Sequence, residues 1–126
     1  MSVAYVDTSA LVAIAFDEDG SAAVTDQLIE NTRLLSSNLL EAELRSACSR
    51  EGVVFSPELC ANLDWVFPDR SLAREIATVL DVGYLRGADL WHVASALYVA
   101  PEPDEMQFIT LDTQQQTVAE AVGFRI

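Results

Sequence analysis

Two aspartates directly follow apolar runs that are expected to be buried strands. Asp7 follows Val3–Val6, and Asp112 follows Met106–Leu111. A threonine comes next in both places, and a helical pattern starts there. In parallel sheets covered by helices, functional groups gather beyond the carboxyl ends of the strands. The two aspartates are therefore candidates for one shared site, although either could instead only cap the helix that follows it.

Two further acids lie on predicted helices, at positions that belong to an apolar face. A period of 3.6 residues places Glu43 between Leu40 and Ala47 on one stripe. Asp89 aligns in the same way with Val93. A carboxylate in the first turn of a helix complements the helix dipole, which is a sufficient structural reason for Asp89 alone. Glu43 has no such reason, and an unpaired buried carboxylate costs on the order of several kcal/mol or takes up a proton.

Glu41 differs from Glu43, although the two are close in sequence. It lies toward the edge of the stripe and one helical turn before Arg45. Opposite charges at this spacing pair on exposed helix surfaces. We therefore expect a surface ion pair for Glu41 and an inward position for Glu43.

The chemistry suggested by four converging carboxylates is metal binding. Like charges in one crevice repel by on the order of several kcal/mol per close pair at an effective dielectric constant near 20. The chain has no lysine, and Arg86 is the only base close in sequence to any of the four acids. Hard oxygen ligands suit Mg²⁺ or Mn²⁺, and the cluster has no cysteine and no second histidine, which argues against zinc. A metal held in this way commonly activates water for phosphodiester hydrolysis. His92 is the single histidine, which excludes a two-histidine ribonuclease mechanism and favours a supporting role for its ring.

The charge of the chain limits its partners. The net charge is −13, and all seven basic residues are arginine. Such a surface repels nucleic acid at long range and attracts cations or a basic partner, although it also serves solubility. Any contact with RNA then depends on local arginine, for which Arg86 is the best candidate; an exposed salt bridge is an equally good explanation of this residue. The absence of lysine excludes P-loop and Schiff-base chemistry.

The patterning of the chain predicts an α/β domain with a mostly parallel central sheet covered by helices, because continuous apolar strands alternate with helical segments. A third strand is expected over Arg33–Ser36, and Phe124–Ile126 is a candidate last strand. The helices are predicted over residues 8–16, 21–30, 38–50, 57–66, 72–80, 87–100 and 113–122. The longest apolar run near the N-terminus, Ala10–Phe16, is far too short to span a membrane, so we expect a cytoplasmic protein.

Taken in order, four segments resemble PIN-domain ribonucleases, and most closely the VapC-type toxins of bacterial and archaeal toxin–antitoxin pairs. The segments are VDTSAL (6–11), LEAEL (40–44), LRGADLWHVA (85–94) and ITLD (109–112). Their order and spacing cover essentially the whole chain. The resemblance implies a three-layer PIN-like fold in a single domain, residues 1–126.

The resemblance also implies roles for individual residues. It assigns the family's acidic quartet, which holds Mg²⁺ or Mn²⁺ and positions the attacking water, to Asp7, Glu43, Asp89 and Asp112. The implied supporting hydroxyls belong to Thr8 or Ser9 and to Thr110. This chain departs from the family pattern after Asp112, where some members carry one more acid and this chain has three glutamines, Gln114–Gln116. The departure leaves the second metal position open.

The same resemblance implies partners. Such toxins cleave RNA, are held by a cognate VapB-type antitoxin with a basic C-terminal segment, and are commonly homodimers; none of this involves a membrane. A second interpretation keeps the PIN fold but makes the protein a catalytically silent interaction module. The presence of all four acids counts against that alternative.

Overall fold

A four-stranded sheet forms the centre of the structure, a computed structural model that describes residues 2–126. The strands are β1 (Val3–Val6), β2 (Arg33–Ser37), β3 (Leu63–Val66) and β4 (Gln107–Ile109). Neighbouring strands are parallel throughout, in the order β3-β2-β1-β4. The predicted α/β class with a parallel sheet is confirmed.

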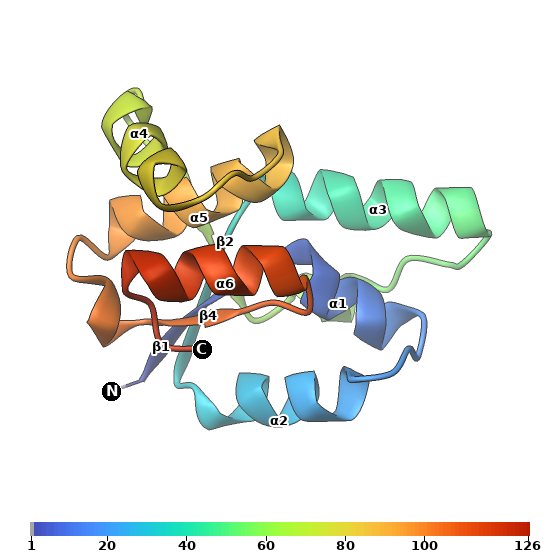
Figure 1. The fold of residues 1–126 in the computed structure, drawn as a ribbon. Helices are drawn as coiled ribbons and strands as arrows, with labels where there is room; N and C mark the ends of the chain where they lie inside the picture. Colours follow the sequence, from blue (N-terminus) through green and yellow to red (C-terminus); the bar gives the residue numbers. More distant parts are fainter. Residues whose placement is uncertain (1) are drawn as a thin grey trace.

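Helices cover both faces of the sheet. They are α1 (Thr8–Ala15), α2 (Ser21–Glu30), α3 (Leu39–Glu51), α4 (Ala73–Val82), α5 (Gly87–Val99) and α6 (Thr113–Val122). Buried side chains of α1, α2 and α3 form one core cluster, and those of α4, α5 and α6 form another. Figure 1 shows α2 on one side of the sheet and α4 on the other, which is the predicted three-layer arrangement. None of the helices within residues 2–126 has the length and apolar character needed to cross a membrane.

The central strand β1 is buried on both faces, which explains its continuous apolar sequence. Successive side chains of a strand point to opposite faces, so Tyr5 joins the α4–α6 cluster while Ala4 and Val6 join the other. The Tyr5 ring stacks on Phe108 of β4, with 5.4 Å between the ring centroids. Each buried large apolar side chain contributes about 1.5–3 kcal/mol to folding. Burial of this strand therefore fixes the backbone position of the adjoining Asp7.

The order of the strands creates a switch point beside β1. From β1 the chain adds β2 and then β3 on one side, whereas β4 pairs with the other side of β1. In open parallel sheets such a point leaves a crevice beyond the carboxyl ends of the two strands. Asp7 comes directly after β1, and Asp112 comes shortly after β4. The topology therefore brings the two aspartates to the same edge.

The prediction of a helix over residues 57–66 is wrong. This segment begins as a short 3₁₀ helix, η1 (Pro57–Cys60), and then becomes the edge strand β3. Leu63 and Val66 are three residues apart, a spacing that puts two side chains on the same face of a helix but on opposite faces of a strand. In the structure Leu63 packs in the α1–α3 cluster and Val66 in the α4–α6 cluster. Pairing with β2 therefore decides a pattern that is ambiguous in the sequence.

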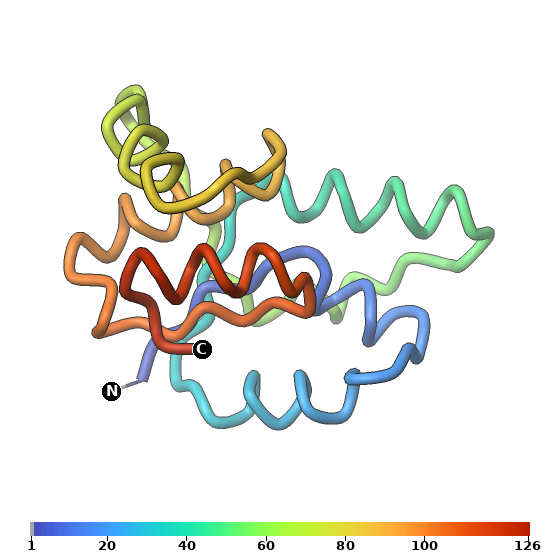
Figure 2. The backbone as a smooth tube through the Cα atoms, in the orientation of Figure 1, coloured from blue at the N-terminus to red at the C-terminus, as the bar shows by residue number. Residues whose placement is uncertain are grey.

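The candidate last strand over Phe124–Ile126 is reduced to a single bridge. Arg125 pairs with Gln107, and its carbonyl accepts a hydrogen bond of 2.7 Å from the Phe108 N–H. A second short 3₁₀ helix, η2 (Pro103–Glu105), precedes β4. Figure 2 shows the chain end returning to the side of the sheet where β1 begins, which leaves the opposite edge free for the acids.

Candidate active site

Asp7 is the most deeply buried of the four predicted acids, with 3% of its surface exposed. It caps α1: its Oδ2 accepts a hydrogen bond of 3.0 Å from the Ser9 N–H. Its Oδ1 accepts one of 3.1 Å from Nε2 of Gln115, and the Thr110 hydroxyl lies 3.3 Å from Oδ2. The capping role weighed from the sequence is therefore real. It does not turn the carboxylate away from the crevice.

Asp112 also caps a helix. Its Oδ1 accepts the N–H of Gln115 at 2.9 Å, at the start of α6. The Thr110 hydroxyl accepts the Asp112 N–H at 3.0 Å and donates to Oε1 of Gln115 at 2.7 Å. Ser9 joins the same network, since its Oγ accepts the Leu111 N–H at 3.0 Å and lies 3.1 Å from Oγ1 of Thr110. These contacts fix the turn that follows β4 against the turn that follows β1.

Glu43 reaches the same place from α3. Its Oε1 accepts hydrogen bonds of 2.7 Å from both the Thr8 hydroxyl and Nε2 of His92, and 30% of its side chain is exposed. Burial tends to raise the pKa of this carboxyl, but the hydrogen bonds from His92 and Thr8 outweigh it and hold the pKa below its ordinary value. Glu41 instead pairs with Arg45 at 3.2 Å, on the exposed side of the helix. The expected division between the two glutamates is confirmed.

Asp89 lies in the first turn of α5, where its charge complements the helix dipole. Its pKa is raised, first by burial and then by the negative charges of Asp7 and Asp112. Arg86 opposes this shift, and Glu43 adds to it. Each of the other three acids is thus close enough to act on Asp89. We call Asp7, Glu43, Asp89 and Asp112 the acid cluster.

The free oxygens of the acid cluster suit a hard divalent cation. Among the described residues, Oε2 of Glu43, Oδ2 of Asp112 and both carboxylate oxygens of Asp89 accept no hydrogen bond. No three acidic, histidine or cysteine side chains within residues 2–126 are arranged as a ready-made metal cage. Mg²⁺ does not need one, because it keeps several waters and binds through one or two carboxylates. The donor set therefore fits Mg²⁺ or the similar Mn²⁺.

Arg86 occupies the residue before α5 and is exposed. Within residues 2–126 it forms no ion pair, so the salt-bridge explanation of this residue finds no support. Its charge opposes part of the rise in the pKa of Asp89, which lies three residues further along the chain. It is available to a ligand that approaches the acids.

Sequence reasoning missed the part played by Gln115. This side chain is completely buried and links three elements: it donates to Asp7 and to the backbone carbonyl of Asp89, at 3.2 Å, and accepts from Thr110. A signal was present, because Gln115 stands one helical turn before the buried Val118 and Ala119. Gln114 is different, since its amide donates to the Tyr84 carbonyl at 2.8 Å on the exposed side. Gln115 is therefore a neutral donor that holds Asp7 in place.

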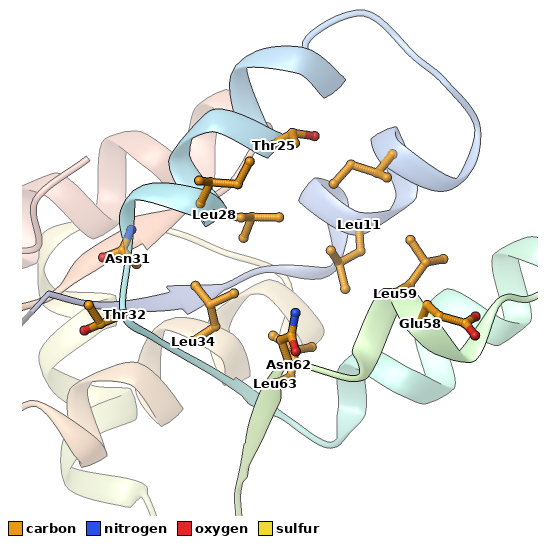
Figure 3. Close-up of a pocket in the computed structure, with 12 residues that line it drawn as sticks. Leu11, Thr25, Leu28, Asn31, Thr32, Leu34, Glu58, Leu59, Asn62 and Leu63 are labelled. Atoms are coloured by element: carbon orange, nitrogen blue, oxygen red, sulfur yellow. The ribbon is translucent and has the colours of Figure 1, made fainter.

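A separate hollow of about 570 Å³ lies elsewhere on the molecule, as Figure 3 shows. Its walls are mainly apolar side chains of α1, α2 and η1, among them Leu11, Leu28 and Leu59. Thr32 and Asn62, which precede β2 and β3, mark the opposite end of the parallel strands from Asp7. This hollow holds none of the acid cluster and is not part of the candidate site.

Comparison with known proteins agrees with the geometry. The PIN domain family model matches residues 4–121. Two relatives, both Ribonuclease VapC35 of Mycobacterium tuberculosis (strains CDC 1551 / Oshkosh and ATCC 25618 / H37Rv), are 32% identical over 127 aligned positions, which cover 97% of this chain and 93% of theirs. No solved structure gives a significant match. The chain therefore belongs to the PIN-domain family, among its VapC-type ribonucleases.

Proposed function

We propose that this protein is a divalent-metal-dependent endoribonuclease, the toxin of a toxin–antitoxin pair, and that the acid cluster is its active site. The observation that carries the proposal is that Gln115 joins three of the acids, since it donates to the carboxylates of Asp7 and Asp112 and to the backbone carbonyl of Asp89. The raised pKa of Asp89 agrees with this arrangement. Clustered titratable groups with perturbed pKa values are typical of functional sites. The relatives named Ribonuclease VapC35 support RNA as the substrate.

The charge balance of the acid cluster supports a metal requirement. The chain has no lysine, and among the described residues Arg86 is the arginine whose charge opposes the raised pKa of Asp89. Neighbouring carboxylates about 4 Å apart repel by about 4 kcal/mol at an effective dielectric constant of 20. Held by these acids, Mg²⁺ or Mn²⁺ would offset the repulsion and would supply the activation of water needed for phosphodiester hydrolysis.

The acids differ in how the protein holds them. Asp7 and Glu43 are each fixed by several donors, which keeps their carboxylates in place. Asp89 and Asp112 keep oxygens free of hydrogen bonds among the described residues. These oxygens and Oε2 of Glu43 are proposed to hold the metal, one or two of them directly and the rest through its waters. The proposed role of the hydroxyls of Thr8, Ser9 and Thr110 is to orient these acids.

Arg86 is the proposed contact for RNA phosphate. A net charge of −13 makes the surface as a whole repel RNA, so binding depends on a local cation and on the metal. The exposure of Arg86 and its effect on Asp89 support this role. Arginine binds phosphate with two parallel hydrogen bonds, which helps to orient the substrate.

The proposed partner is a VapB-type antitoxin with a basic C-terminal segment, acting on a single cytoplasmic PIN domain over residues 1–126. The strong negative charge and the unneutralised acid cluster support a basic segment that covers the site. A homodimer is proposed as well. Phe67 and Tyr84, which are 65% and 69% exposed, are large enough to be covered in such an assembly.

The direct test is RNA cleavage by the purified protein without its partner. Structured RNAs are incubated with Mg²⁺ or Mn²⁺, beside an EDTA control and the Asp7→Asn variant. We expect cleavage that both controls abolish, and a raised KM for Arg86→Ala. Cleavage that survives both controls would show a contaminant or a metal-free mechanism. Absence of cleavage with every RNA would favour the silent interaction module.

A further inference from the structure

His92 lies completely buried between the core and the acid cluster. Its Nδ1 is 2.7 Å from the Tyr5 hydroxyl, and its Nε2 is 2.7 Å from Oε1 of Glu43. Nε2 also lies 3.1 Å from the Thr8 hydroxyl. The ring therefore joins a residue inside the α4–α6 layer to an acid that comes from the opposite layer of helices.

The direction of these hydrogen bonds follows from their donors. The Ser37 N–H donates to the Tyr5 hydroxyl oxygen at 3.0 Å, so this oxygen acts as an acceptor there and its own hydrogen points elsewhere. Burial raises the pKa of Tyr5, so the phenol keeps its proton, and its hydroxyl lies within hydrogen-bond distance of Nδ1 of His92. The carboxylate of Glu43 can only accept, so Nε2 of His92 carries the proton of the 2.7 Å hydrogen bond between them.

We call the hydrogen-bonded chain from Tyr5 through His92 to Glu43 the relay. It begins at a firmly packed residue. Tyr5 belongs to the central strand, its ring stacks on Phe108, and it meets the His92 ring edge-on at 5.8 Å between centroids. Glu43 is by contrast a partly exposed side chain, with 30% of its surface accessible. Its Oε1 receives both available donors, from His92 and Thr8, while Oε2 receives none among the described residues. The relay thus determines which oxygen is presented to the crevice.

We propose that His92, held in place by Tyr5 and donating from Nε2, is a positioning residue that orients Glu43 toward the metal. The inference rests on the proposed metal-dependent function and adds a named device to it. Outer hydrogen bonds of this kind orient metal ligands, and their loss typically lowers metal affinity or activity by about 10–100-fold. The ring acts through Glu43 and does not contact the reacting atoms.

The proton on Nε2 can be read directly, because His92 is the only histidine in the chain. In metal-free protein with ¹⁵N-labelled histidine, we expect NMR to show a protonated Nε2. Tyr5→Phe removes only the hydroxyl and should shift the Nδ1 resonance, because this nitrogen loses its partner. A wild-type ring without a proton on Nε2 would overturn the proposal, whatever the activity of the protein.

Metal affinity and kinetics supply the second readout. Tyr5→Phe should weaken Mn²⁺ binding and lower kcat by about 10-fold, with the KM for RNA little changed. His92→Gln places an amide N–H near the position of Nε2 and should retain much of the affinity, whereas His92→Leu should lose about 10–100-fold. Tyr98→Phe is the matched control, since it deletes a hydroxyl that donates to Asp69 at 2.9 Å, away from the acids.

The outcomes separate this inference from the proposed function. Folded Tyr5→Phe and His92→Leu variants that bind Mn²⁺ like the wild type would overturn the role of the relay and leave the metal-dependent nuclease intact. A wild-type protein that binds no Mn²⁺ would overturn both. Because Tyr5→Phe is a minimal change, it remains informative even if His92→Leu does not fold.

Discussion

Two groups of acids in this protein show opposite electrostatics. On α4, Glu75 receives both arms of the Arg70 guanidinium, at 3.0 and 2.5 Å, and Arg70 in turn lies over the Tyr98 ring. The Arg70 hydrogen bonds lower the pKa of Glu75 to about 2. In the acid cluster, burial and neighbouring negative charges raise the pKa of Asp89 instead. The protein itself satisfies the charge of Glu75 and leaves that of Asp89 unsatisfied.

The difference indicates which group serves stability and which serves function. Both acids are half-buried or buried, and both lie in the first turn of a helix. Helix position therefore cannot explain why one has a cation and the other has not. Natural proteins keep such locally unfavourable arrangements mainly at functional sites. We propose that an external cation balances the charge of the acid cluster.

The largest expected effect comes from replacing a charged acid by its neutral amide, first in the acid cluster and then at Glu75. Asp89→Asn removes a proposed metal ligand and should lower RNA cleavage by at least about 100-fold, the upper end of what loss of an outer hydrogen bond costs. In metal-free buffer the same change should raise the melting temperature, because it removes repulsion from Asp7 and Asp112. Cleavage rates and thermal unfolding in EDTA measure the two effects.

Glu75→Gln is the matched counterpart and should do the reverse. Cleavage should stay at the wild-type rate, while the melting temperature should fall, because Arg70 loses a charged partner. If both substitutions lowered the melting temperature without metal, the acids of the cluster would stabilise the fold in the same way as Glu75. The contrast between the two groups would then be wrong.

A smaller effect is expected from metal binding to the folded state. Mg²⁺ or Mn²⁺ at about 100 times its Kd should stabilise the wild type by about 2.7 kcal/mol, since the unfolded chain has no site. Glu43→Gln should blunt the resulting rise in melting temperature. Glu41→Gln should not, because Glu41 pairs with Arg45 at the surface. The opposite result would mean that the assignment of the two glutamates is reversed.

Local sequence patterns were sufficient to predict the features that depend on a single strand or helix. The apolar run of β1 ending at Asp7 and the inward position of Glu43 could be predicted, because strand burial and helix periodicity each leave a clear trace. The three-layer order followed from alternating strands and helices together with the family resemblance. These predictions needed no knowledge of which elements pack together.

Features that depend on distant contacts were missed. The segment 57–66 has a spacing that fits a helix, and only pairing with β2 makes its second half a strand. Gln115 looks like one of three surface glutamines until Asp7, Thr110 and Asp89 are brought around it. The relay from Tyr5 to Glu43 joins residues from three different elements. No local pattern specifies such a contact, because the partners meet only in the folded chain.

The smallest expected effect is the pH dependence of the Glu75 pair. The pKa of Glu75 is about 2 in the folded protein and 4.5 ordinarily, so the pair stabilises the fold fully above pH 4.5. As pH falls from about 5 toward 2, the Glu75 carboxylate becomes protonated in the unfolded chain before it does so in the folded protein. The unfolded state is thereby favoured, and the stabilisation by the pair is lost. Wild type should therefore exceed Glu75→Gln by about 1.5 kcal/mol near neutral pH, within the range for hydrogen bonds to charged groups.

This difference should shrink steadily below about pH 5 in urea-unfolding curves. Glu51→Gln is the control, because Glu51 pairs with Arg50 at 3.1 Å but both side chains are more than half exposed. Such a pair contributes about 0–1 kcal/mol, so its substitution should change little at any pH. A Glu75→Gln effect that is equally large at neutral and acidic pH would have to come from packing, and Glu75 would no longer be the satisfied counterpart of Asp89.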